Sequence, residues 1–97
     1  MAKRSEDWSE GLAQQLRDTE VAREFMLAWI EEGETLREAL ARTVRAYGVT
    51  EFAKDAHLPV SNVSRALRSD YNPGHNLLSQ MLAVLGLELS AQPRKVA

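Results

Sequence analysis

The stretch that most constrains the fold runs from Val49 to Arg68 and reads VTEFAKDAHLPVSNVSRALR. Its apolar residues recur at helical spacing, stop at a tight turn around Leu58 and then resume, which predicts two short helices. The apolar residues on the inner faces of these helices are Phe52, Ala53, Ala56, Val60, Val63, Ala66 and Leu67. We therefore expect two short helices that pack against each other at a sharp angle.

The second of these helices has an unusual outer face. Its residues are short hydrogen-bonding groups and arginines, with no acid among them: Ser61, Asn62, Ser64, Arg65 and Arg68. A helix-turn-helix needs such a face to enter the major groove of DNA. A helical bundle with a polar outer face has the same spacing and remains the alternative.

DNA binding would give each polar residue of this stretch a role. Val60, Ser61 and Arg65 are expected to face base edges, where arginine can pair with guanine through two hydrogen bonds. Other residues are expected to contact phosphates, which fix the position of the protein without reading sequence. These residues are Thr50, Asn62, Ser64, Arg68 and Asn76. Thr50 and Asn76 are also predicted to cap the helices that follow them.

The length and composition indicate one ordinary domain. The chain has 97 residues, of which 44% are hydrophobic and 27% charged. We expect a mobile N-terminus over residues 1–8, a single domain over 9–90 and a loose tail over 91–97. No signal peptide or membrane-spanning stretch is visible, so we expect a cytoplasmic protein with no membrane contact.

The residues needed for catalysis or metal binding are not found in the sequence. There is no cysteine, and His57 and His75 have no further ligands at the spacing of a metal site. Neither a glycine-rich phosphate loop nor a nucleophile elbow is present. We therefore expect no enzyme activity, no metal and no cofactor.

The charge distribution bears on DNA binding. The formal net charge of −2 argues mildly against it, because neutralisation of phosphates is its general driving force. Residues 1–49 carry seven Lys or Arg and ten Asp or Glu, whereas residues 50–97 carry five and four. The positive charge is therefore local and modest, and we expect tight binding only from a homodimer.

The rest of the chain is predicted to be mainly helical. Asp18 or Thr19 is expected to cap one helix, and Thr35 and Glu38 have the spacing of a capping box at the start of another. Residues Leu87 to Ser90 alternate as a short strand would. The expected fold class is all-α, with about five helices and a short C-terminal strand.

The helix after Asp18 has a wider apolar stripe than one core contact requires. Phe25, Met26, Trp29 and Ile30 spread around more than one side of it. This pattern fits a second packing surface for a partner, and it also fits a helix that is buried on two sides within the monomer. The sequence leaves both interpretations open.

Together these segments resemble a known family. From about Leu16 to Leu89 the chain is similar to the small antitoxins of bacterial toxin–antitoxin modules called addiction module antidote proteins. These belong to the λ-repressor-like (Xre/Cro) helix-turn-helix superfamily and are related to HigA-type antitoxins. The resemblance rests on the segments REALARTVRAYG, VTEFAKDAHLPVSNVSRALRS and NPGHNLLSQMLAVLGLELS. Two residues depart from the family pattern: His57 replaces the usual turn glycine, and Pro59 replaces the usual serine.

The resemblance implies two activities. One is neutralisation of a small basic toxin of the RelE/ParE/HigB type, and the other is repression of its own operon by binding palindromic half-sites in double-stranded DNA. An acidic, apolar-backed helix would complement such a toxin. The candidate toxin contacts are Phe25, Met26, Trp29, Ile30, Glu31 and Glu32. The alternatives are a stand-alone Xre-type repressor without a toxin, and a module whose helix-turn-helix binds only protein.

Overall fold

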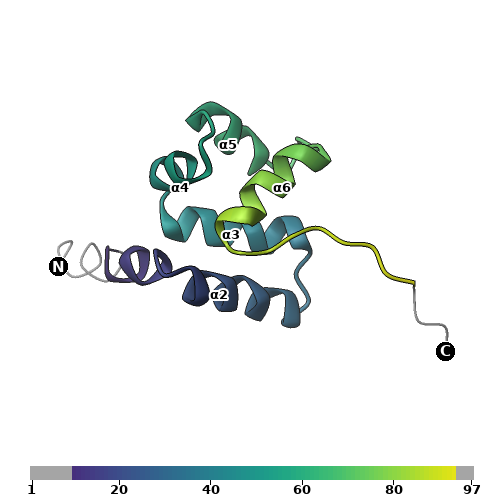
Figure 1. The fold of residues 1–97 in the computed structure, drawn as a ribbon, viewed down its shortest axis with the longest axis horizontal. Helices are drawn as coiled ribbons and strands as arrows, with labels where there is room; N and C mark the ends of the chain where they lie inside the picture. Colours follow the sequence, from purple (N-terminus) through teal and green to yellow (C-terminus); the bar gives the residue numbers. More distant parts are fainter. Residues whose placement is uncertain (1–9, 94–97) are drawn as a thin grey trace.

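Within residues 10–93, which a computed structural model describes, all regular structure is helical (Figure 1). A helical segment over residues 10–16 precedes α2 (Thr19–Glu31), α3 (Leu36–Tyr47), α4 (Val49–Ala56), α5 (Val60–Ala66) and α6 (His75–Val84). The predicted all-α class is confirmed, with one helix more than expected. The predicted mobile N-terminus and residues 94–97 of the predicted tail lie outside the described residues. None of the described helices is both long and apolar enough to cross a membrane.

Local signals set the helix boundaries where the sequence predicted them in α2 and α3. The Asp18 carboxylate accepts a hydrogen bond from the Glu20 amide at 2.9 Å. Thr35 and Glu38 form both hydrogen bonds of the capping box, at 3.1 and 2.8 Å. Gly48 ends α3 with a φ of 108° and is also the residue before α4, so α3 and α4 meet at a sharp corner.

Two other predicted caps are wrong. Gly48, not Thr50, is the residue before α4, and Thr50 lies inside the first turn. Gly74 is the residue before α6, so Asn76 also lies inside its helix. Neither helix has a side-chain cap. In both cases a glycine starts the helix earlier than the nearest capping side chain.

The core lies around α3, which has α2 on one side and α4, α5 and α6 on the other (Figure 1). The largest fully buried side chains come from all of these helices and their flanks: Leu16, Met26, Val44, Phe52, Val63, Met81, Leu82 and Leu85. Tyr47 and Phe52 meet edge to face across the corner between α3 and α4, with ring centroids 5.3 Å apart. Within α5 only Val63 and Ala66 are buried, so this helix lies on the outside of the domain.

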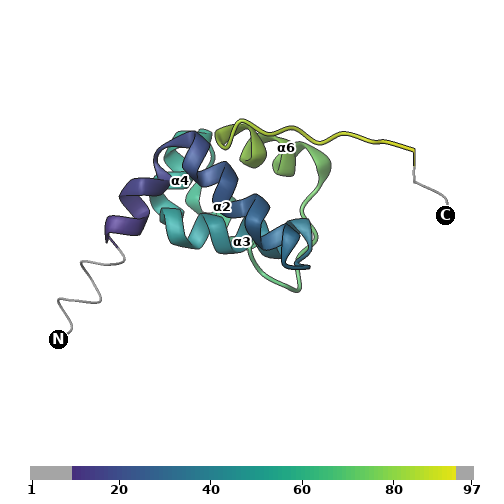
Figure 2. The same ribbon diagram turned by 90° about the horizontal axis from the view of Figure 1, so that it is seen from below.

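The predicted strand at Leu87–Ser90 is not formed. The chain after α6 contacts the core through Leu87 and Leu89 and then leads away from the helices (Figures 1 and 2). Residues 87–93 have no strand assignment and no neighbouring strand in the described part of the chain. An alternating pattern of apolar residues is therefore not enough to form a strand, because a strand also needs a second strand as its hydrogen-bonding partner.

Candidate functional site

A tight turn holds α4 and α5 together. His57 adopts the left-handed conformation, with φ 58° and ψ 42°. The His57 amide donates to the Lys54 carbonyl at 3.2 Å, and the Leu58 amide donates to the Ala53 carbonyl at 2.9 Å. These bonds form a Schellman motif, which normally uses glycine at this position. His57 therefore adopts a positive φ without being glycine, in a region that histidine tolerates better than branched residues do.

Pro59 then starts α5. Its φ of −61° suits the start of a helix, but it provides no side-chain cap. Val63 and Ala66 point into the core, and Val63 is fully buried. The opposite side of α5 is consequently directed outward by the packing of these two residues.

The outward side of α5 brings two of the three predicted base-contacting residues together, Ser61 and Arg65. Val60 is 43% exposed, and Ser61 and Arg65 are exposed. Ser61 and Arg65 are four residues apart and lie on the side of the helix opposite Val63, whereas Val60 is three residues before Val63 and lies closer to the core side. Ser64 and Arg68 are exposed beside them, whereas Asn62 is partly buried. This side of α5, without any acidic residue, is called the α5 face below.

Two arginines dominate the charge of the α5 face. Arg65 lies over the Tyr71 ring, with its guanidinium carbon 5.8 Å from the ring centroid. Arg68 pairs with Asp70 through hydrogen bonds of 3.0 and 2.7 Å, and both side chains are mostly exposed. Such an exposed pair is weak, so a phosphate can compete with Asp70 for Arg68.

The remaining phosphate candidates are placed elsewhere. Thr50 is exposed on α4, and Asn76 is exposed on α6. Neither side chain makes a hydrogen bond to α5 in the described part of the chain. The structure therefore does not join these two residues to the α5 face.

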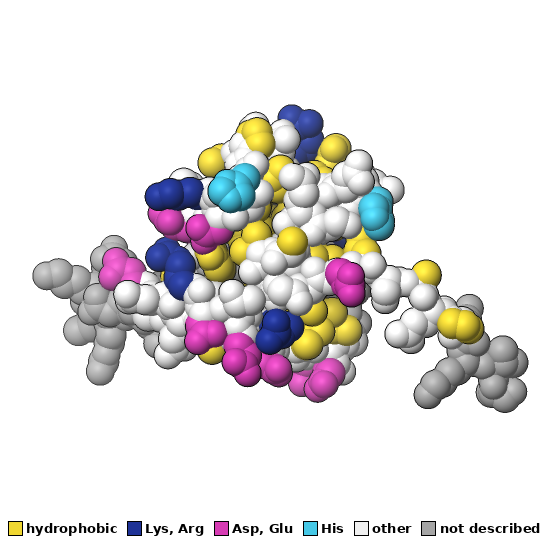
Figure 3. Space-filling model, viewed as in Figure 1, with side chains coloured by type: hydrophobic (Ala, Val, Ile, Leu, Met, Phe, Trp, Pro, Cys, Tyr) yellow, Lys and Arg dark blue, Asp and Glu magenta, His cyan; other side chains and the backbone are white. Residues whose placement is uncertain are grey.

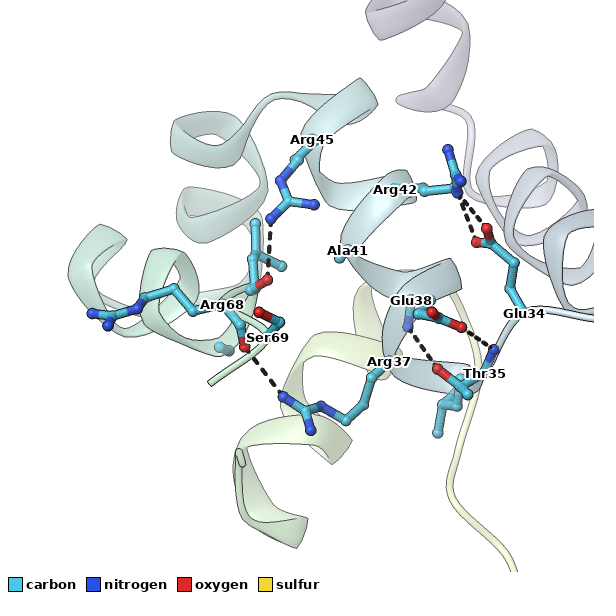
Figure 4. Close-up of a pocket in the computed structure, with 12 residues that line it drawn as sticks. Glu34, Thr35, Arg37, Glu38, Ala41, Arg42, Arg45, Arg68 and Ser69 are labelled. Atoms are coloured by element: carbon cyan, nitrogen blue, oxygen red, sulfur yellow. Dashed lines mark hydrogen bonds and ion pairs between the residues drawn. The ribbon is translucent and has the colours of Figure 1, made fainter. Parts of the chain in front are cut away.

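Two arginines that were not predicted as site residues support the end of α5. Arg45 donates from Nη2 to the Leu67 carbonyl at 3.1 Å. Arg37 donates from Nη2 to the carbonyls of Arg68, at 3.2 Å, and Tyr71. Figure 4 shows both side chains reaching from α3 toward this end of α5. In the sequence Arg37 and Arg45 lie off the apolar stripe of α3 just as Arg42 does, so no local signal identifies this role.

The predicted toxin-binding surface on α2 is only partly accessible. Met26 is fully buried, so it serves the core and is not available to a partner. Phe25, Trp29 and Ile30 are partly buried, because α2 packs against α3. The wide apolar stripe is thus used largely within the monomer.

The outer side of α2 is acidic with exposed apolar residues between the acids. Figure 3 shows acidic side chains gathered along the edge of the molecule that α2 forms. The exposed acids of α2 and its C-terminal cap are Glu20, Glu24, Glu31 and Glu32. Val21 and Leu27, which were not predicted as contacts, are 41% and 37% exposed. These six residues define the α2 ridge.

Trp29 has a neighbour that limits its accessibility. The Arg42 guanidinium lies over its ring, 4.2 Å from the centroid, and Arg42 also pairs with Glu34 at 2.7 Å. Phe25 meets the same ring edge to face, with centroids 6.3 Å apart. Trp29 is therefore held in place from both sides.

Comparisons of the chain with known protein families, curated proteins and solved structures find no match.

Proposed function

We propose that this protein is an antitoxin that represses its own operon. In this proposal α4 and α5 act as a helix-turn-helix that binds operator DNA, and the α2 ridge binds a small basic toxin in the cytoplasm. The observation that carries the proposal is the exposed α5 face, which has two arginines, small hydroxyl groups and no acid. Such a face has the right chemistry for base edges and phosphates.

The roles within the α5 face follow from its geometry. Ser61 and Arg65 lie on the exposed side of α5, where they can reach base edges in a major groove. Arg68 lies just beyond the end of α5 and is suited to a phosphate. Because one monomer offers few cations, we propose a homodimer that binds two half-sites about one helical turn of DNA apart.

The DNA-binding proposal is tested with the DNA upstream of the gene. Replacement of Arg65 by alanine is expected to cost about 1–3 kcal/mol in operator binding and to relax the preference at one base pair. Replacement of Arg68 by alanine is expected to weaken binding to all duplexes alike and to reduce the dependence on salt. Arg23→Ala removes one positive charge on α2, outside α4 and α5, and is the matched control. Operator binding by both test variants at the wild-type level would falsify the groove assignment.

The toxin-binding proposal rests on charge and exposed apolar area. The α2 ridge combines four carboxylates with Val21 and Leu27, and a basic partner would neutralise the former and cover the latter. We expect the product of the neighbouring gene to be such a partner and to co-purify with this chain. Glu31→Lys with Glu32→Lys should abolish this co-purification, whereas Glu88→Lys, an exposed reversal off α2, should not.

The same experiment separates the alternatives. A chain that binds its operator but has no partner encoded next to it would be a stand-alone repressor. A chain that binds a protein partner but shows no sequence-specific DNA affinity would be a protein-binding module. Retention of the partner by the double reversal would remove the α2 ridge from the proposal.

A further inference from the structure

An open groove of about 800 Å³ lies between α3 and the end of α5 (Figure 4). Four arginines line it: Arg37, Arg42, Arg45 and Arg68. The carboxylates in its lining belong to Glu34 and Glu38. Figure 4 shows the Arg68 guanidinium directed away from the groove, so the guanidinium groups next to the groove come from α3.

Both carboxylates of the groove are already engaged. Glu34 accepts two hydrogen bonds from Arg42 Nε, at 2.7 and 2.8 Å. Glu38 accepts from the Thr35 amide, and this backbone hydrogen bond lowers the pKa of its carboxyl group. Neither forms an ion pair with Arg37 or Arg45 in the described part of the chain.

Arg37 and Arg45 thus differ from Arg42. Their hydrogen bonds go to backbone carbonyls, which orient the guanidinium groups but carry no full negative charge. Arg45 is exposed, and only its Nη2 is used. Arg37 is partly buried, and its Nε is buried without a hydrogen-bond partner. The groove consequently holds two oriented arginines, neither of which forms an ion pair with a carboxylate of residues 10–93.

We infer that this groove is a phosphate-binding site for the DNA backbone, with Arg45 as its main contact. The inference rests on the proposed DNA binding. Arg68 belongs both to the groove lining and to the α5 face, so the two surfaces are continuous. A DNA strand that is bound at the α5 face and continues past the end of α5 would pass over Arg45. The groove is open, as a polymer requires, and it adds a cation where the α5 face itself has few.

The test separates the charge of Arg45 from its hydrogen bond. Gln at position 45 keeps a donor for the Leu67 carbonyl and loses the charge, whereas Lys keeps the charge. We would measure fluorescence anisotropy of labelled operator and random-sequence duplexes between about 50 and 200 mM salt. Arg45→Gln is expected to weaken both duplexes by the same factor, about tenfold, and to reduce the salt slope by about one. Arg45→Lys is expected to retain affinity and slope.

Arg23→Gln is the matched control, because Arg23 also donates to a backbone carbonyl, that of Leu85, but lies on α2 outside the groove. It should leave the salt slope unchanged. Ser69→Glu provides a second variant that keeps all the arginine hydrogen bonds, since Ser69 is an exposed lining residue. It should weaken both duplexes as Arg45→Gln does, and urea unfolding would establish that each variant is folded.

Several outcomes would overturn the inference. Wild-type binding by both Arg45→Gln and Ser69→Glu would exclude the groove from the DNA path while leaving the α5 face in place. An Arg45→Gln variant that keeps its DNA affinity but binds an oligoglutamate peptide less tightly would assign the groove to an acidic protein segment. Failure of the wild-type chain to bind any duplex would instead refute the proposed DNA-binding function.

Discussion

The Tyr47 hydroxyl donates a hydrogen bond to the Asp55 carboxylate and thereby ties the end of α3 to α4. Tyr47 is only 4% exposed, and its ring meets Phe52 edge to face. This contact fixes the corner at Gly48, from which the direction of α4 and then of α5 follows. The orientation of the α5 face therefore depends on a buried phenol well away from it in the sequence.

Tyr47 should make stability depend on pH in the alkaline range. Burial, reinforced by the hydrogen bond to Asp55, raises the pKa of Tyr47 from 10.0 to about 12. Between these values the folded chain holds a proton that the unfolded chain has lost, so the free energy of unfolding falls as pH rises from about 10 to about 12. Urea unfolding at several pH values would measure this decrease. Tyr47→Phe should lack this component, and equal pH dependence of the two proteins would contradict the assignment.

His57→Gly should stabilise the protein. The left-handed conformation of His57 is unfavourable for a residue with a side chain, and glycine adopts it freely. We expect the free energy of unfolding to rise by about 1 kcal/mol. This value already includes the opposing effect that glycine has more conformational freedom in the unfolded chain. His57→Val should instead lower stability, because a branched side chain is disfavoured there. The unfolding temperatures of the two variants would be compared. A higher unfolding temperature for His57→Val than for His57→Gly would contradict this prediction and show that the turn changes its conformation.

Thr35→Ala should weaken the start of α3. The Thr35 side chain accepts from the Glu38 amide, and its loss leaves that amide to water. The expected cost is about 1 kcal/mol, measured by urea unfolding. Thr35→Ser retains the hydroxyl and should remain close to wild type. A fall of the same size in the serine variant would point to the lost methyl group instead of the cap.

Met26 and Leu27 form a matched pair on α2. Met26 is fully buried and Leu27 is 37% exposed. Met26→Ala should cost about 2–5 kcal/mol in unfolding free energy, because it leaves a cavity in the core. Leu27→Ala should change stability by less than about 0.5 kcal/mol and should weaken binding of the proposed toxin. Similar stability losses for the two variants would mean that Leu27 is covered in solution.

Local chemistry was readable from the sequence wherever one residue decides the outcome. Asp18 and the Thr35–Glu38 pair cap their helices as predicted, and Gly48 ends α3. His57 takes the positive φ that a tight turn at this position requires. Each of these features depends on groups within a few residues of one another, so helical periodicity and capping rules suffice to predict them.

The wrong predictions concern helix starts at which a glycine lies close to a capping side chain, and segments whose structure depends on a neighbouring strand or helix. Glycines at 48 and 74 started helices before Thr50 and Asn76 could cap them. The alternation at Leu87–Ser90 found no second strand among the described residues. Met26 belongs to the wide apolar stripe of α2. Which residues of this stripe are buried depends on where α3 packs, and the sequence alone does not show this.

The all-α class, the starts of α2 and α3, the turn at His57 and the residues of the α5 face could be predicted from the amino-acid sequence. Three features depend on how the helices pack: Arg37 and Arg45 reach the end of α5, the α2 ridge is exposed at Val21 and Leu27, and a groove opens beside Arg68. The two groups of features differ in the distance along the chain between the residues that decide them. Helices and caps depend on contacts between near neighbours, whereas a groove depends on how whole helices pack, and Arg37 and Arg68 are 31 residues apart in the chain.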